Sequence, residues 1–364
     1  MIPQFDLKRQ YELIKNEIDT ELRSVLNSGK FILGENVQEI EEMISSYLGI
    51  NYAISCNSGT DAIFLALKSI NISNGDEIIT TPFTFISTVE AIINSGAKPV
   101  FVDIDEDSFN IDTRKIEEKI SDKTKAILPV HLFGNPVNIK EIKELTQNKD
   151  IKIIEDCAQS FGAKYNEDNV GTVGDIGCFS FYPTKNLGCY GDGGLITTNS
   201  KDIYSKLISL RNHGSFDKYN HDSIGINSRL DEIQAAILKV KMNYINEYNN
   251  KRISNAELYS KLLNKNSLVR IPNSSNNAKH VFHQYTIKTE IRDKLIKILE
   301  DNKIGHAIYY PIPLNKQKIY KNLYGQSSFP TAEKVSQNCI SLPMFPELSI
   351  DEIKYISNII NKEV

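Results

Sequence analysis

One lysine, Lys185, stands in a run of aromatic, apolar and glycine residues, FSFYPTKNLGCYGDGG at 179–194. The ordinary alternative is a solvated surface lysine, but Tyr182 and Leu187 are poor company for a charge that only confers solubility. Loss of water lowers the pKa of an ammonium group and leaves a neutral, nucleophilic amine. The stretch therefore predicts a lysine that reacts with a carbonyl carbon.

A carboxylate and an amide follow another apolar run. Asp156 comes directly after IKIIE, and Gln159 lies three residues further on. A carboxylate at the end of a buried strand is costly unless it meets a cation or a hydrogen-bond donor, and a protonated pyridine nitrogen is such a partner. A surface or helix-capping aspartate is the commoner explanation for a single residue of this kind. Asp156 therefore indicates a functional site only together with Lys185.

A third segment, NSGTDA at 57–62, predicts a seat for a phosphate group. Gly59 and Thr60 precede a helical pattern, and the first amides of a helix lack internal partners and lie at the positive end of its dipole. An ordinary turn with Thr60 as the helix N-cap is the alternative. Ser180, five residues before Lys185, could offer its hydroxyl to the same phosphate or be a small strand residue.

A nucleophilic amine, a carboxylate at a strand end and a phosphate seat together fit one cofactor, pyridoxal 5'-phosphate. In such a site the lysine forms an aldimine with the cofactor aldehyde, the aspartate keeps the ring nitrogen protonated, and the helix terminus holds the phosphate. Lys185, once released by an incoming amine, would move the proton between the cofactor carbon and the substrate carbon.

The elements that must position these residues alternate between strands and helices. Amphipathic stretches such as 60–70 and 87–96 predict helices. Between them, short apolar runs predict strands that begin at Tyr52, Glu77, Lys98, Lys125, Ile151, Gly177 and Gly194. Strands that are apolar on both faces indicate an α/β fold with a mostly parallel sheet between helices. In such folds ligands bind beyond the carboxyl ends of the strands.

The pattern changes in the last third of the chain. We expect a long helical segment over about 230–263, a helix in RDKLIKILEDNKI and a final helix from about Ser349. Because 364 residues exceed the length at which one core keeps growing, we expect two domains. They are a large cofactor-binding domain at 1–240 and a smaller C-terminal α+β domain at 241–364.

Composition excludes several kinds of partner. The chain has 24% charged residues and a formal net charge of -4, without the basic excess that holds nucleic acid or an anionic membrane. Its five cysteines are odd in number and never spaced as C-x-x-C, so we expect free thiols and no metal site. No apolar run is long enough for a signal peptide or a membrane span, and we expect a cytoplasmic protein that acts on small molecules.

Five ordered blocks carry a family resemblance. They are NSGTDA, TPFTFIST, IEDCAQSFGA, FSFYPTKNLGCYGDGG and GINSRLDEIQAAIL. The chain resembles, over essentially its whole length, the nucleotide-sugar aminotransferases of the DegT/DnrJ/EryC1/StrS family. The resemblance implies a fold-type I aminotransferase and a homodimer with active sites shared between the subunits. It also implies L-glutamate as the amino donor and pyridoxamine 5'-phosphate as the intermediate form of the cofactor.

The resemblance also implies cofactor contacts. The residues concerned are Gly59, Thr60, Phe85, Asp156, Gln159, Ser180, Lys185 and Asn227. Gln159 would lie near the ring hydroxyl, and Phe85 matches the aromatic residue that stacks on the cofactor ring. Asn227 matches an asparagine that reaches the phosphate of the neighbouring subunit. A core phenylalanine and a loop asparagine are the alternatives for these last two.

The likeness bears on the substrate as well. HAIYYPIPLNKQ and SLPMFP look more like segments of enzymes acting at C3 of UDP-linked 2-acetamido-3-oxo sugars, of gluco or glucuronate type, than like those of dTDP-sugar enzymes. A dTDP-3-oxo-6-deoxyhexose is the alternative substrate. Many relatives carry histidine where this chain has Tyr309. Four residues are each either substrate contacts or structural side chains: Phe31, Tyr182, Arg229 and Tyr309. The amino sugar would serve a bacterial surface polysaccharide or lipopolysaccharide such as O-antigen.

Other interpretations fit less well. GTVGDIG at 171–177 lacks the G-x-G-x-x-G spacing of a nicotinamide-binding loop. Lys185 argues against the family's dehydratases, in which a histidine replaces it. Lys185, Asp156 and Gln159 together argue against a non-catalytic regulatory or binding protein on the same fold, which the fold alone would permit. His131, at a strand end, is expected to be a packed, hydrogen-bonded side chain and not a catalytic one.

Overall fold

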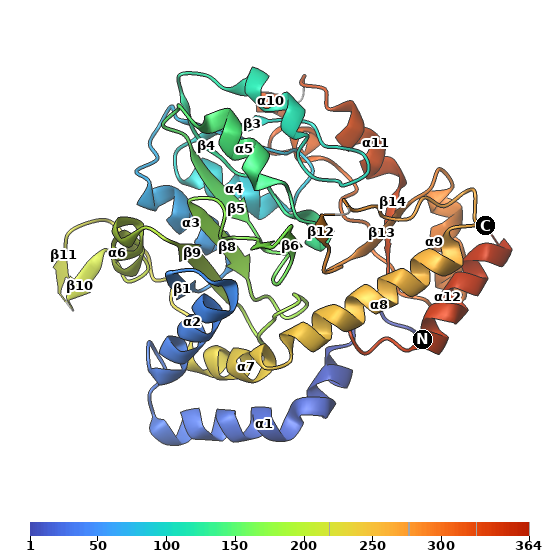
Figure 1. Ribbon diagram of the computed structural model, residues 1–364, viewed down its shortest axis with the longest axis horizontal. Helices are drawn as coiled ribbons and strands as arrows, with labels where there is room; N and C mark the ends of the chain where they lie inside the picture. The colour runs from blue at the N-terminus through green and yellow to red at the C-terminus, as the bar shows by residue number, and fades with distance from the viewer. Residues whose placement is uncertain (218, 276, 325, 364) are drawn as a thin grey trace.

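A seven-stranded sheet between helices forms the centre of the computed structural model, which describes every residue except 218, 276, 325 and 364 (Figure 1). The strands, in spatial order, are β1 (Tyr52–Cys56), β9 (Gly194–Thr198), β8 (Ile176–Ser180), β5 (Lys152–Asp156), β4 (Thr124–Ile127), β2 (Glu77–Thr80) and β3 (Lys98–Phe101). Each of them begins within one residue of a position expected from the sequence. The expected α/β fold is confirmed.

Strand direction follows from how the strands are connected. β8, β5, β4, β2 and β3 run parallel to one another, as expected for strands joined by helices. β9 runs antiparallel to both β8 and β1, because the chain returns from β8 through the loop at 181–193 without a crossover helix. That loop carries Lys185, so the reversal of direction sets the lysine at the carboxyl end of β8.

Both faces of the sheet are apolar, because neighbouring residues of one strand enter opposite clusters. Ile153 and Ile154 of β5 lie in two different buried clusters, and so do Leu195 and Ile196 of β9. One face is covered by α3 (Gly59–Ser69), α4 (Ile86–Asn94) and α6 (Lys201–Leu210). The other is covered by α2 (Glu35–Leu48), α5 (Ile139–Thr146) and α7 (Glu232–Met242), with α1 (Leu7–Ser28) packed on α7.

The long helix expected over 230–263 is wrong in one respect, since two helices occupy that range. α7 ends at Met242, and α8 (Ile245–Leu263) begins after a short break. Met242 belongs to a cluster against the central sheet, whereas Tyr259 belongs to a second cluster in the C-terminal part. The break between α7 and α8 therefore lies where the chain passes from the cluster on the central sheet to the cluster of the C-terminal part.

The C-terminal part is built on its own apolar cluster, formed by residues between 256 and 360. The elements on this cluster are β13 (Tyr285–Lys288), α9 (Arg292–Asp301), β14 (Cys339–Leu342) and α12 (Ile350–Glu363). Two further helices, α10 (Lys321–Tyr324) and α11 (Pro330–Asn338), pack in clusters that include residues of the central sheet. The helices expected in RDKLIKILEDNKI and after Ser349 are therefore present as α9 and α12. The first residues of the chain join this part, because Ile2 forms a bridge with Ile304 and Gln4 accepts a bond from the backbone N–H of Met344. The division at residue 240 remains a prediction that the separate cluster supports.

Short elements complete the fold. β6 (Lys164–Tyr165), β7 (Asp168–Asn169) and β12 (Ala278–Lys279) form a small sheet. β10 (Ser215–Asp217) and β11 (Asn220–His221) form a hairpin that projects from the body of the molecule (Figure 1). Four 3-10 turns lie at Thr113–Lys115, Glu117–Lys119, Leu132–Gly134 and Leu314–Lys316.

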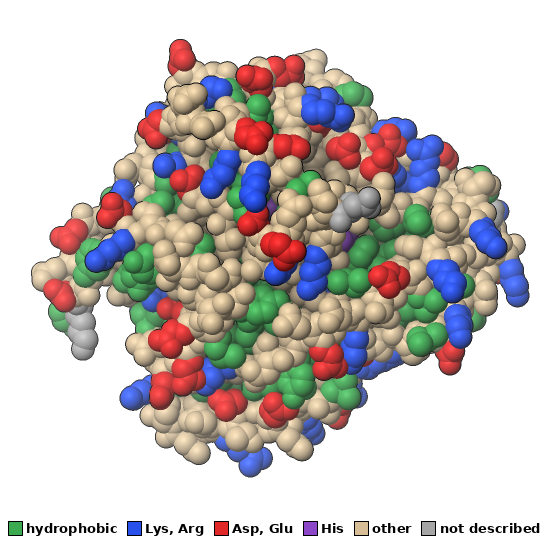
Figure 2. Space-filling model, in the orientation of Figure 1, with side chains coloured by type: hydrophobic (Ala, Val, Ile, Leu, Met, Phe, Trp, Pro, Cys, Tyr) green, Lys and Arg blue, Asp and Glu red, His purple; other side chains and the backbone are tan. Residues whose placement is uncertain are grey.

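The surface and the cysteines agree with the composition. Acidic and basic side chains are interspersed over the face that Figure 2 shows. All five cysteines are free and buried, as expected for thiols. Of the helices in the described residues, none is both long and apolar enough to cross a membrane.

A carboxylate from another helix caps the N-terminus of α2. Gly34 precedes α2 and offers no side chain for capping. Glu232, buried in the first turn of α7, accepts backbone N–H bonds from Gly34 and Val37 through Oε1 and from Asn36 through Oε2, at 2.8, 3.0 and 3.0 Å. The contact joins α2 to α7 by satisfying donors that the helix itself cannot pair.

Replacing this carboxylate tests its contribution to stability. We expect Glu232→Ala to lower the free energy of unfolding by about 2–3 kcal/mol, because three backbone N–H donors that are buried or partly buried lose their acceptor. Glu232→Gln should lose less, since its amide oxygen still accepts. Urea unfolding followed by circular dichroism at one protein concentration measures both, and an alanine variant as stable as wild type would contradict the assignment.

Candidate active site

A cavity of about 650 Å³ lies beyond the carboxyl ends of β5 and β8. It is bounded by the turn between β1 and α3, the segment after β2, and two C-terminal segments, 283–284 and 308–310. Of the twelve site residues expected from the sequence, nine line this cavity: Gly59, Thr60, Phe85, Asp156, Gln159, Ser180, Tyr182, Lys185 and Tyr309. The structure thus brings together residues that lie as far as 250 positions apart in the chain.

The expected phosphate seat is a helix N-terminus in contact with the end of β8. Ser58, and not Thr60, is the N-cap of α3, since its side chain accepts a bond from the backbone N–H of Asp61 at 3.1 Å. The helix begins at Gly59, where a Cβ atom would lie 2.7 Å from the Cβ of Ser180. Glycine permits this close approach, so the helix terminus and the Ser180 side chain face the same end of the cavity and could hold a phosphate.

Asp156 ends β5 with its carboxylate almost fully buried, at 4% exposure. Its Oδ2 accepts a bond from Thr88 Oγ1 at 2.9 Å, and its Oδ1 accepts one from the backbone N–H of Ala158 at 3.1 Å. Burial raises the pKa of Asp156, while these two hydrogen bonds and the Lys185 ammonium act against the rise. A protonated ring nitrogen in the cavity would supply a further donor that favours the charged carboxylate.

Lys185 is half-buried and lines the same cavity. Burial lowers the pKa of its ammonium group to about 8, and the nearby Asp156 carboxylate acts in the opposite direction. Its backbone N–H donates to Tyr182 O at 2.8 Å, so the lysine sits in a tight turn. Asn186 holds that turn by donating to Val281 O and Asn249 Oδ1, at 3.0 and 2.7 Å. A neutral amine is therefore accessible near neutral pH.

Aromatic side chains form one wall of the cavity. Gln159 is held at both ends, because its Oε1 accepts from the backbone N–H of Phe133 at 2.8 Å and its Nε2 donates to Tyr310 Oη at 3.1 Å. The Phe85 ring is 54% exposed and lies 6.3 Å from the Tyr310 ring, centroid to centroid. Thr88 and Tyr310 were not expected from the sequence. Thr88 lies in TPFTFIST, three residues after Phe85, and Tyr310 directly follows Tyr309. Each is therefore close in sequence to a residue that was expected in the site.

Three expected residues do not line the cavity of the described chain. Asn227 is exposed and forms a bridge with Asn212, whose side chain also accepts a bond from Arg229 at 3.3 Å. Phe31 is 44% exposed in the segment before α2. Ser228, between Asn227 and Arg229, donates to Asp61 Oδ2 at 2.6 Å and so rests on the same chain's helix terminus.

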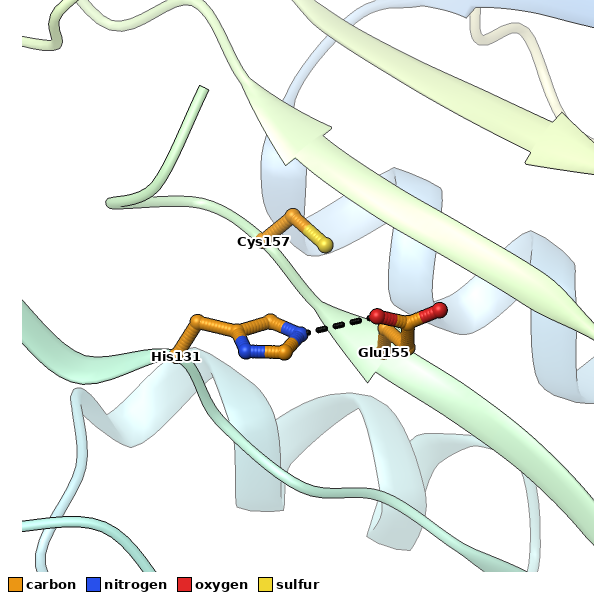
Figure 3. A group of neighbouring side chains, drawn as sticks. All are labelled: His131, Glu155 and Cys157. Atoms are coloured by element: carbon orange, nitrogen blue, oxygen red, sulfur yellow. Dashed lines mark hydrogen bonds and ion pairs between the residues drawn. The ribbon is translucent and has the colours of Figure 1, made fainter. Parts of the chain in front are cut away.

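A buried group of potential metal ligands, His131, Glu155 and Cys157, includes both sequence neighbours of Asp156 (Figure 3). Nε2 of His131 lies 2.9 Å from Glu155 Oε2, and Nδ1 accepts a bond from the backbone N–H of Val137 at 2.9 Å. His131 is therefore the packed, hydrogen-bonded side chain expected from the sequence. Burial raises the pKa of the Cys157 thiol well above its usual value, so the sulfur stays protonated and is a poor metal ligand.

The carboxylate of Glu155 is already occupied. Besides His131, its two oxygens accept three backbone N–H bonds at 2.6 to 3.0 Å, from Gly171, Val173 and Gly174. The glycine-containing loop at 171–174 thus wraps around a buried carboxylate. Among the described residues this group anchors a loop, and its donor set does not fit a metal ion.

The cavity defines a class of enzyme, the pyridoxal phosphate-dependent aminotransferases, and comparisons with known proteins agree. The chain is 42% identical over 361 residues to the UDP-N-acetyl-3-dehydro-alpha-D-glucosamine 3-aminotransferase of Acidithiobacillus ferrooxidans, covering 99% of this chain and 97% of that one. It is 44% identical over 358 residues to a protein of Geobacillus stearothermophilus called pleiotropic regulatory protein, covering 98% and 96%.

A solved structure shows the same architecture. The crystal structure of DesV from S. venezuelae, in complex with a ketimine intermediate, superposes with a TM-score of 0.97 at 35% identity and covers 99% of this chain and 98% of that one. The model of the DegT/DnrJ/EryC1/StrS aminotransferase family matches residues 12–361. The chain belongs to this family.

The lowered pKa of Lys185 makes a prediction about cofactor binding. Protein freed of cofactor should recombine with pyridoxal phosphate at a rate that rises with pH and levels off above about 8, because only the neutral amine attacks the aldehyde. Stopped-flow absorbance after mixing measures the rate. An unperturbed lysine would place the midpoint near 10.5 instead.

Asp156→Asn is the matched control for this measurement. The carboxylate raises the pKa of Lys185, so its loss should move the midpoint below that of wild type. The variant should still take up some cofactor but lose most turnover, since a neutral amide stabilises a ring N–H cation poorly. A midpoint that rises, or full activity, would show that Asp156 does not act on Lys185 and the ring.

Proposed function

We propose that this enzyme transfers the amino group of L-glutamate to C3 of a UDP-linked 2-acetamido-2-deoxy-3-oxo-hexose of gluco or glucuronate type. The observation that carries the aminotransferase chemistry is the half-buried Lys185 beside the buried Asp156 in one cavity. The choice of sugar rests on the Acidithiobacillus relative and its name. A cavity of about 650 Å³ falls within the usual size of a small-molecule site. The amino sugar would serve a bacterial surface polysaccharide or lipopolysaccharide.

Each residue that would hold the cofactor would contact a different part of it. When bound, the cofactor supplies an aldehyde and a ring that accepts electrons. Asp156 would hold the ring N–H, Gln159 would approach the ring hydroxyl, and Phe85 would cover one face of the ring. Gly59, Thr60 and Ser180 would bind the phosphate at the N-terminus of α3.

Lys185 would do two tasks with one nitrogen. Because burial lowers the pKa of its ammonium group to about 8, Nζ is neutral in a useful fraction of molecules near neutral pH and can bind the aldehyde carbon. The same nitrogen, when free, would move a proton between the substrate carbon and the cofactor carbon. Tyr182 and Tyr309, which line the cavity, would limit the access of water and touch the sugar.

Two alternatives stay open to the same assays. A dTDP-linked 3-oxo-6-deoxyhexose is favoured by the dTDP-3-amino-3,6-dideoxy-alpha-D-galactopyranose transaminase of Aneurinibacillus thermoaerophilus, which is 40% identical over 362 residues. A non-catalytic regulator is favoured only by the name of the Geobacillus relative. A regulator has no need for the buried lysine and carboxylate, and purified protein that is yellow and bleaches with glutamate would exclude it.

We expect Lys185→Ala to abolish turnover and leave the fold intact, because the nucleophile and the proton carrier are lost and little buried volume changes. Mass spectrometry with glutamate and a panel of UDP- and dTDP-linked 3-oxo and 4-oxo sugars measures both the substrate preference and the loss. Multiple turnovers by this variant without an added amine would contradict the assignment, and preference for a dTDP sugar would replace the proposed substrate.

We further propose a homodimer in which each cofactor site is completed by the neighbouring subunit. Support comes from Asn227 and Arg229, two polar residues that do not line the cavity of their own chain. The segment that contains them, GINSRLDE, is one of those that resemble the family. Ser228 holds their loop against its own chain's phosphate seat through Asp61. Asn227 would reach the partner's phosphate from this anchored loop, so dimer and cofactor should stabilise each other by mass action.

Mixing two inactive variants tests the shared site. Asn227→Asp should be inactive because a second anion beside the phosphate repels it. In a heterodimer with Lys185→Ala, one site takes its lysine from one chain and its asparagine from the other and is wild type in both. We expect recovery of up to about half the sites of each heterodimer if sites behave additively. Confirmed heterodimers that recover nothing would show that Asn227 acts within its own chain.

A further inference from the structure

A second lysine, Lys241, is buried against the loop that carries Lys185. Lys241 lies in the last turn of α7 and is only 2% exposed. Burial lowers the pKa of its ammonium group to about 8, because a charged group loses its water there. An apolar side chain of similar length would fill the same space at a lower cost in free energy. A lysine at this position therefore calls for a role other than packing.

The ammonium group of Lys241 contacts the loop at two places. Its Nζ donates to Gly188 O at 2.7 Å and lies 4.2 Å from the centre of the Tyr190 ring. A charged donor makes a stronger hydrogen bond than a neutral one, and a cation is attracted to the face of an aromatic ring. Both contacts lie within five residues of Lys185 along the chain.

The loop is narrow where Lys241 meets it. The backbone N–H of Cys189 donates to Phe181 O at 2.8 Å, which joins the two sides of the loop. Gly188 packs directly on the first side, where a Cβ atom would lie 2.6 Å from Pro183 O. A shift of Gly188 would therefore be passed to the backbone that leads into Lys185.

The same face of α7 holds the loop with a second side chain. Gln234 stands seven residues before Lys241, which places both on one side of the helix. Its Oε1 accepts a bond from the backbone N–H of Tyr190 at 2.9 Å. A Cβ atom at Gly191 would lie 2.8 Å from Gln234 Nε2, so the loop packs closely on this side chain. The helix thus fixes a carbonyl and an N–H group of the loop.

We propose that Lys241 is a positioning residue for the reaction, which holds through Gly188 O the turn from which Lys185 enters the cavity. Asn186 fastens the same turn to Val281 O at 3.0 Å. Misplacing a reacting group by about 1 Å can cost about 100-fold in rate, so a fixed backbone at this turn serves the chemistry of Lys185. The inference rests on the role of Lys185 in the proposed function.

Lys241→Met separates positioning from packing. Methionine keeps an apolar stem and removes the donor and the charge. We expect the cofactor-free variant to melt within about 3 °C of wild type, because the cost of burying a charge disappears together with its hydrogen bond. Its recombination with pyridoxal phosphate, followed by stopped-flow absorbance, should nevertheless be about tenfold slower at the high-pH plateau. The pH midpoint should not move, since burial and Asp156 set the pKa of Lys185.

Lys239→Met is the matched control. Lys239 lies on the same helix, but its partners belong to α1 and α2: it pairs with Glu21 at 3.6 Å and with Glu39, and it donates to Asn36 at 2.8 Å. Its loss should leave the recombination rate at the wild-type value even where the melting temperature falls. Gln234→Leu removes the second anchor without removing a buried charge, and it should slow recombination as Lys241→Met does.

The reaction with glutamate gives a further readout. Bleaching of the Lys241→Met holoenzyme should have a lower maximal rate at an unchanged half-saturating concentration of glutamate, because the anchor acts on Lys185 and not on the bound amino acid.

Three results would overturn the proposal: wild-type rates in Lys241→Met, equal slowing in Lys239→Met, or loss of the fold in Lys241→Met, which would make Lys241 a structural residue. Wild-type protein that does not recombine with pyridoxal phosphate would instead contradict the role of Lys185, so the two failures are distinguishable.

Discussion

The position of the Asp156 carboxylate is the constraint on which the rest of the site depends. The backbone of Asp156 is bonded twice to the segment that follows β4, through its N–H to Pro129 O at 2.9 Å and through its carbonyl to the N–H of His131 at 3.0 Å. Because neighbouring side chains of a strand point to opposite faces of the sheet, the Glu155 side chain lies on the other face from Asp156. There it accepts hydrogen bonds from the loop at 171–174. The buried carboxylate of Glu155 thus fixes the scaffold, and that of Asp156 is left for chemistry. The Asp156 carboxylate also raises the pKa of the Lys185 ammonium group, against the effect of burial.

Much of the fold and the centre of the site could be predicted because their signals are local. Apolar runs long enough to be buried on both faces marked each strand of the central sheet, and polar residues after those runs marked Asp156 and Lys185. The alternative for NSGTDA named Thr60 as the N-cap of α3, but Ser58 is the N-cap, since both residue types cap helices well and only geometry separates them. The break between α7 and α8 was missed for a related reason. Both halves read as helical, and the change of core is not visible in the sequence of either.

The remainder depends on contacts between distant parts of the chain. Thr88 meets Asp156 across 68 residues and Tyr310 meets Gln159 across 151, and neither pairing has a trace in spacing or composition. Gln4 likewise meets Gln284, which lines the cavity, across 280 residues. The expected roles of Phe31 and Arg229 as substrate contacts, and of Asn227 at a neighbouring subunit's phosphate, stay predictions, because none of the three lines the cavity of its own chain.

The pairing of the chain's first residues with its last part has a consequence for synthesis. Ile2 and Gln4 are synthesised some 300 residues before Ile304 and Leu342, their partners. The central sheet and Lys185 are complete long before that. Nascent chains can therefore form the scaffold early, while the wall of the cavity that contains His283 and Tyr310 closes only when both ends of the chain are available. A substitution at Ile2 or Gln4 would therefore alter the wall of the cavity, although both residues lie far from Lys185 in sequence.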